Sequence, residues 1–140
     1  MKSTISLILI AFLLITSCSD KKDNTQEDLL KKVMAVHDEI MPKMGDIMKY
    51  KKQLKAKIDE LSEAGAEENA GQIAKLKKGV EDLENSHEGM MNWMHEFDRN
   101  FESEVQDEVI AYMKDQMTKI ESVGKMTNTA IANAKELLAE

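Results

Sequence analysis

An apolar repeat of seven residues runs through residues 26–62 and restricts this part of the chain to a helix. Position a of the repeat carries Leu30, His37, Met44, Lys51 and Ile58, and position d carries Val33, Ile40, Ile47, Leu54 and Leu61. Met34, Met41 and Met48 recur at position e and widen the apolar face. Because this face is broader than the seam of a two-stranded coiled coil, the pattern predicts a helix inside a bundle.

Two further helices are predicted, over residues 66–97 and 101–138. The first has Ile73, Val80, His87 and Met94 at position a, and Leu76, Leu83, Met90 and Phe97 at position d. In the second helix, the residues predicted to face inward are Val105, Val109, Tyr112, Met113, Gln116, Met117, Ile120, Val123, Met126, Ala130, Ile131, Ala134, Leu137 and Leu138.

Short connections separate the three predicted helices, at Gly65 and at residues 98–100. Short connections make neighbouring helices antiparallel. The sequence therefore predicts an all-α fold, an elongated antiparallel three-helix bundle with coiled-coil-like heptad packing over residues 26–140. A dimeric assembly of longer coiled coils, and so a homo-oligomer, is the alternative.

The N-terminus resembles a bacterial lipoprotein signal. Lys2 precedes an apolar run from Ile5 to Ile15, which leads through Thr16 and Ser17 to Cys18. We expect residues 1–17 to be a signal peptide, Cys18 to carry lipid such as palmitate, and residues 18–25 to be a flexible tether. Since Ser follows the cysteine, analogy with lipoprotein sorting favours the outer membrane of the cell envelope, on its periplasmic or surface face.

The charge and the motifs limit the function classes. The formal net charge of −7 argues against a nucleic-acid ligand and against direct contact with anionic lipid. We find no glycine-rich phosphate loop, no Ser-His-Asp order and no Cys-x-x-Cys pair in the sequence. The chain is therefore predicted not to be an enzyme, and to contact the membrane through its lipid anchor and an unknown protein through its helices.

Histidine and methionine gather at one level of the predicted bundle. In an antiparallel hairpin turning near Gly65, facing residues have numbers that sum to about 130. This register sets His37 beside Trp93 and Met94, and His87 beside Met44. Imidazole and thioether groups together suit Cu(I), so the candidate ligands for copper are His37, Met41, Met44, His87, Met90 and Met94.

Two other interpretations of this layer stay open. Methionine is a flexible filler of helical cores, so the layer is also explained by packing alone, with no cofactor. Histidines at core positions also fit a pH switch, in which their protonation in acid loosens the bundle.

Residues that weaken helices lie at the same level. Pro42 lacks an N–H and clashes with the carbonyl of Asp38, which predicts a kink, because the heptad continues through it in register. A break, with Pro42 starting a new helix, is the alternative. Gly45 and Gly89 are expected to weaken the same region. Together these residues place a backbone irregularity beside the Met/His layer.

The segments His37–Met44 and Met91–Phe97 resemble a family of small Bacteroidota lipoproteins that automatic naming often terms "viral A-type inclusion protein". The resemblance implies the cell envelope and a helical fold, and it implies no activity. The combined expectation is a lipid-anchored helical envelope protein that acts as a binding or structural module. A copper-binding or copper-sensing lipoprotein is the alternative.

Overall fold

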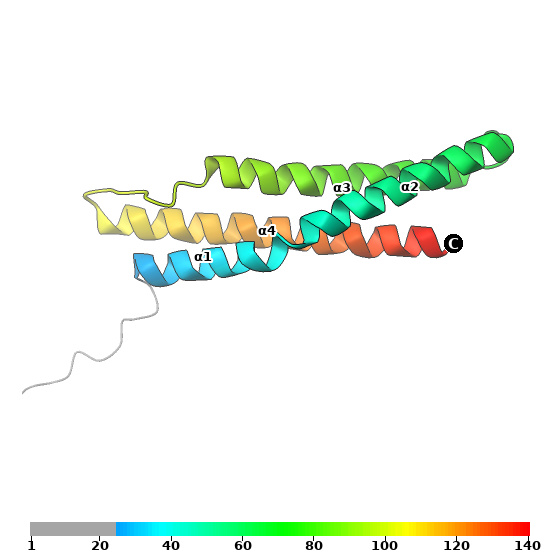
Figure 1. The fold of residues 1–140 in the computed structure, drawn as a ribbon. Coiled ribbons are helices and arrows are strands. Elements are labelled where there is room, and N and C mark those ends of the chain that lie inside the picture. The colour runs from blue at the N-terminus through cyan, green and yellow to red at the C-terminus, as the bar shows by residue number, and fades with distance from the viewer. Residues whose placement is uncertain (1–24) are drawn as a thin grey trace, which may run out of the picture.

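The computed structural model describes residues 25–140, which form four α-helices (Figure 1). The helices are α1 (Gln26–Ile40), α2 (Lys43–Gly65), α3 (Ala70–Glu96) and α4 (Gln106–Ala139). They pack against one another as a bundle, so the predicted all-α class is confirmed. The predicted signal peptide and most of the predicted tether, including Cys18, lie outside the described residues.

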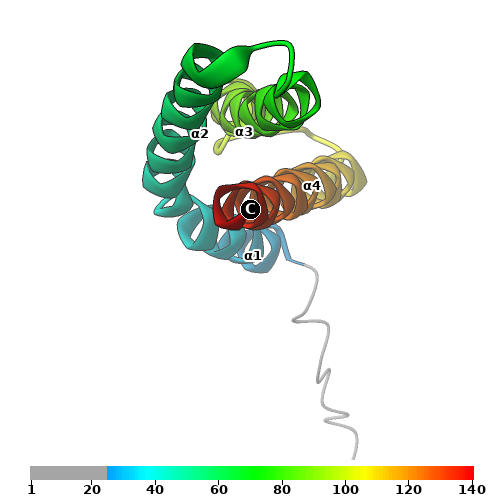
Figure 2. The same ribbon diagram turned by 90° about the vertical axis from the view of Figure 1, so that its right-hand side faces the viewer.

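The helices form three antiparallel rods, the first of which is divided into α1 and α2. The two parts of this rod have different neighbours. α1 lies mainly against α4, whereas α2 packs against both α3 and α4. Figure 2 shows α2 leaving α1 and crossing the side of the bundle until it reaches α3.

The break between α1 and α2 lies at Met41 and Pro42. The last regular bond of α1 runs from the N–H of Met41 to the carbonyl of His37, over 2.9 Å. Pro42 has no N–H with which to continue this ladder. The structure therefore has two helices with a break between them instead of the predicted single kinked helix, although Met41 and Pro42 both keep right-handed helical dihedral angles.

The apolar repeat continues through the break in register, because Ile40, Met44 and Ile47 are all buried. Together with residues of α3 and α4 they form one continuous core. Several predicted positions differ. Leu29 is buried in place of Leu30 at the start of α1, and Met48, Val105 and Met126 are exposed.

The third predicted helix begins at Gln106 instead of residue 101. Val105 precedes this helix in an extended conformation, and it is 52% exposed instead of facing the core as predicted. The connection between α3 and α4 is therefore longer than predicted. Its apolar residues Phe97, Phe101 and Val105 recur every four residues, which is a helical spacing, so the pattern alone placed the start of the helix too early.

Gly124 sets the distance between α1 and α4. A Cβ atom at this position would lie 2.6 Å from Cδ1 and 3.3 Å from Cγ1 of Ile40, the last residue of α1. Gly89 faces α4 and not the break, since its Cβ would meet Met126 and Val123. Gly45 has open space around it. The glycine that packs against the residue before the break is thus Gly124, and not Gly45 or Gly89, which were predicted to weaken this region.

Candidate functional site

Four rings form a column at the end of the bundle where α1 begins. We call Trp93, Phe97, Phe101 and Tyr112 the aromatic stack. Phe97 lies 4.7 Å from Trp93 and 6.4 Å from Tyr112 between ring centroids, and Phe101 lies 4.2 Å from Tyr112. The stack joins α3, the α3–α4 connection and α4, so it ties this end of the bundle together.

Hydrogen bonds hold the connection on the stack. The hydroxyl of Tyr112 accepts from the N–H of Asp98 over 2.7 Å, and Nε2 of Gln26 donates to the carbonyl of Phe101 over 3.3 Å. The second bond joins the first residue of α1 to the α3–α4 connection. The start of the described chain therefore lies at the same end as the aromatic stack.

His37 of α1 reaches α3 beside this stack. Its Nε2 lies 3.4 Å from Sδ of Met94, and its ring centroid is 5.7 Å from that of Trp93. The side chain of His37 is 17% exposed and that of Trp93 is buried. The register argument placed His37 beside Trp93 and Met94, and the structure confirms this placement.

Asp38 determines which nitrogen of His37 carries the proton. Oδ1 of Asp38 lies 2.9 Å from Nδ1 of His37. Because a carboxylate accepts hydrogen bonds and does not donate them, it favours the form with hydrogen on Nδ1. In the neutral imidazole, the lone pair of Nε2 then faces the sulfur of Met94.

The other four predicted metal ligands have different surroundings. Met44 and Met90 lie in the apolar core, and Met41 packs at its edge. His87 is half-buried and lies about 10 Å along α3 from Met94, at 1.5 Å per residue. One ion held between His37 and Met94 is therefore out of reach of His87, and the six residues do not form a single site.

Three buried polar groups of α3 and α4 were not predicted from the sequence. Oγ of Ser86 and Oγ1 of Thr127 are buried and lie 2.8 Å apart, which links α3 to α4. Nε1 of Trp93 is also buried, and it has no hydrogen-bond partner among the described residues. Ser86 and Trp93 lie one residue before His87 and Met94, which the predicted repeat placed at the buried position a, so the pattern did not assign them to the core.

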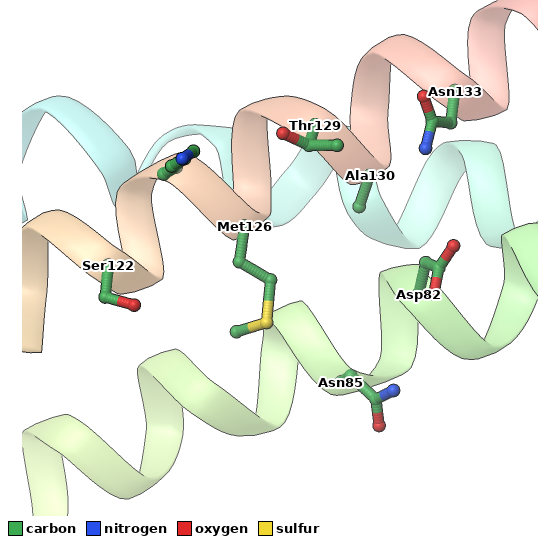
Figure 3. A pocket seen from close by; sticks show the side chains of 8 residues that line it. Asp82, Asn85, Ser122, Met126, Thr129, Ala130 and Asn133 are labelled. Atoms are coloured by element: carbon green, nitrogen blue, oxygen red, sulfur yellow. The ribbon is translucent and has the colours of Figure 1, made fainter.

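A hollow lies on the surface between α3 and α4, with a volume of about 360 Å³ (Figure 3). Met126 extends from α4 across its floor toward α3, and polar residues including Asp82 and Asn85 line its rim. The carboxylate of Asp82 is already bound by Nζ of Lys78 at 2.7 Å. The hollow is open and lined mostly by exposed side chains, so it is a weaker candidate than the His37 region.

The resolved pKa shifts belong to surface ion pairs. Glu84 of α3 accepts from Lys55 of α2 at 3.1 Å and lies 3.7 Å from Lys51. The hydrogen bond from Lys55 is the main reason that the pKa of Glu84 lies below its ordinary value. Similar pairing raises the pKa of Lys78, chiefly through Asp82. The Glu84 pairs join α2 to α3, whereas Lys78 and Asp82 lie on the same helix, α3.

Comparisons with family models, curated proteins and solved structures give no match to this chain. Among residues 25–140, no helix has the length and apolar character needed to cross a membrane. The same residues contain no group of three or more His, Cys, Asp or Glu side chains placed to hold a metal ion. Only the sequence motifs and the geometry of the described residues therefore bear on the function.

Proposed function

We propose that this chain is a lipid-anchored protein of a bacterial cell envelope, on the periplasmic or surface face of the outer membrane. Its helical bundle acts as a binding or structural module and not as an enzyme. The lipoprotein-like signal ending at Cys18 supports the anchor. The closed core and the interhelical ion pairs support a rigid module.

The contact between Gln26 and Phe101 carries this proposal, because it relates the anchor to the site. Eight residue steps separate Cys18 from Gln26, and a fully extended chain of this length spans at most about 29 Å. Lipid on Cys18 therefore keeps the end with the aromatic stack near the membrane. The turn between α2 and α3 lies at the opposite end of the bundle (Figure 1).

We expect the binding partner to contact an apolar residue at the end of the bundle that lies near the membrane. Val105, between the aromatic stack and α4, is the most exposed large apolar side chain of the described residues. The partner is a protein: the net charge of −7 disfavours both nucleic acid and the headgroups of anionic lipids. A second copy of the chain is one such partner.

The anchor is tested by Cys18→Ser in the full chain. We expect the variant to lose radiolabelled palmitate and to leave the membrane fraction, because one polar hydroxyl replaces the acylated thiol. Ser19→Ala is the matched control and should keep both label and fraction. An unlabelled parent chain, or a Cys18→Ser variant that stays in the membrane fraction as before, would contradict the anchor.

The binding role is tested by placing a photo-crosslinking side chain at Val105 in living cells. The matched control is the same side chain at Glu67, which is exposed in the turn between α2 and α3. We expect a discrete adduct from Val105 only. An adduct of twice the chain's own mass identifies a homo-oligomer, and any other single mass identifies another protein. No adduct from Val105, or equal adducts from both positions, would refute the binding role.

A further inference from the structure

We propose that His37 and Met94 form a binding site for a soft monovalent metal ion, Cu(I), beside the indole of Trp93. This inference does not depend on the proposed function, because it concerns side chains inside the bundle. It reduces the six residues that the sequence nominated to two donors from two helices.

The donor atoms converge from opposite helices. Nε2 of His37 on α1 and Sδ of Met94 on α3 are separated by 3.4 Å. Bonds of about 2.0 Å from a metal to imidazole nitrogen and about 2.3 Å to sulfur put two donors about 4.3 Å apart in the linear geometry of a two-coordinate ion, and about 3.7 Å apart at a trigonal angle that leaves a third position for an external ligand. The two atoms therefore need only a small outward movement to accept one ion.

The carboxylate of Asp38 prepares the imidazole for this role. With the Nδ1 hydrogen donated to Asp38 at 2.9 Å, neutral His37 directs a lone pair from Nε2 toward the lone pairs of the sulfur. In that form the two lone pairs repel at this distance unless a proton on Nε2, which would donate to the sulfur, or a metal ion lies between them. Histidines that ligate metals usually donate their other ring N–H to a carboxylate or carbonyl in this manner.

The chemistry of the donors selects the ion. Thioether sulfur with neutral imidazole suits Cu(I), whereas Mg²⁺ and Ca²⁺ require oxygen ligands. Zn²⁺ in proteins takes four ligands, which the pair does not supply. Trp93 is 5% exposed and places its ring beside the imidazole, where an aromatic face attracts a nearby cation and limits access of water.

Trp93 is the only tryptophan of the chain and reports directly on the site. We would titrate Ag(I), a soft monovalent ion that is stable in air, into the full chain in detergent and follow tryptophan fluorescence. Cys18→Ser is present throughout, because it removes the only thiol. We expect a change that saturates at one ion per chain, the same result with Cu(I) under anaerobic conditions against a competing chelator, and no binding of Zn²⁺ at equal concentration.

Variants then assign the ligands. Met94→Leu keeps the volume of the side chain and removes the sulfur, and with His37→Gln it should weaken binding at least about tenfold. Asp38→Asn should weaken it about 10- to 100-fold through the orientation of His37, with helicity and metal-free melting temperature unchanged. The controls are Met48→Leu and His95→Gln, whose parent side chains are exposed, and both should bind as the parent does.

The proposal is overturned if micromolar Ag(I) and Cu(I) leave the fluorescence unchanged. It is equally overturned if Met94→Leu binds as tightly as the parent, or if Met48→Leu loses as much affinity as Met94→Leu. In the last case the ion binds exposed thioethers and not the pair. Each variant is checked by circular dichroism, and a folded Met94→Leu chain that binds weakly, beside unchanged controls, supports the site.

Discussion

At the scale of single residues, two glycines in similar helical positions have different roles. A Cβ at Gly124 would meet Cδ1 and Cγ1 of the Ile40 side chain, which is buried at the end of α1. A Cβ at Gly89 would approach closely only the methyl end of Met126, which is 37% exposed and can move aside. Gly124 therefore permits the contact between α1 and α4, whereas an alanine in place of Gly89 would disturb little.

We expect Gly124→Ala to lower the free energy of unfolding by about 1–3 kcal/mol, because a buried contact becomes overpacked. Gly89→Ala is the matched control and should be neutral or stabilising by about 0.5–1 kcal/mol, since alanine is the better helix former. Chemical denaturation of both variants measures the difference. Equal effects of the two substitutions would show that α1 does not depend on close approach at Gly124.

The site at His37 is also decided at this scale. The imidazole touches groups from two sources, the neighbouring Asp38 and Met94 of another helix. The first contact follows from adjacency in the chain, whereas the second requires α1 and α3 to approach at this level. A single side chain thus joins local and tertiary contacts.

At the scale of elements, the break at Pro42 allows the two parts of the first rod, α1 and α2, to pack against different neighbours. α1 follows α4, and α2 turns away to cover α3 and α4 together. A straight helix would keep one axis and could not follow both paths. The break therefore changes the direction of the rod and leaves its buried register intact.

The pairing of α2 with α3 includes the ion pairs of Glu84 with Lys51 and Lys55. These charges bridge two helices at the surface, so their contribution is that of exposed pairs, roughly 0.2–1 kcal/mol. They lie where turns of α2 and α3, already packed together through the core, come side by side.

The pH dependence follows from the lowered pKa of Glu84, whose main cause is the hydrogen bond from Lys55. A carboxylate with a lowered folded pKa stabilises the protein above its unfolded pKa, and this stabilisation is lost as the pH falls through the folded value. We expect Glu84→Gln to lower stability by roughly 0.2–1 kcal/mol at neutral pH. The difference from the parent should shrink as acid protonates Glu84.

Urea unfolding across a pH series, with Glu88→Gln as the exposed control on the same helix, measures this difference. Added salt should reduce it as well, because exposed charges are screened. A Glu84→Gln effect that persists in acid and in high salt would mean that the glutamine disturbs packing instead of removing an ion pair.

At the scale of the whole molecule, the two ends of the bundle differ. One end carries the aromatic stack, the start of α1 and the His37–Met94 pair, and the other carries the short turn between α2 and α3. α4, with 34 residues, spans about 51 Å between these ends. In the proposed function the lipid anchor makes the aromatic end the one that stays near the membrane.

The sequence alone determined the helical class and most of the core. Spacing by seven placed Val33, Ile40 and Ile47 on one buried face, because helical geometry links sequence distance to angle around the axis. The antiparallel register also placed His37 beside Trp93 and Met94, since short turns leave little freedom in how hairpin helices align.

Only the tertiary structure decided how these faces meet. A proline predicts that a helix is interrupted, but the new direction depends on the packing of α2 against α3. The pairing of Gly124 with Ile40 and of Ser86 with Thr127 depends likewise on how closely and at what angle helices cross. Periodicity specifies which side of each helix is buried, whereas the contacts on that side are set by all the helices together.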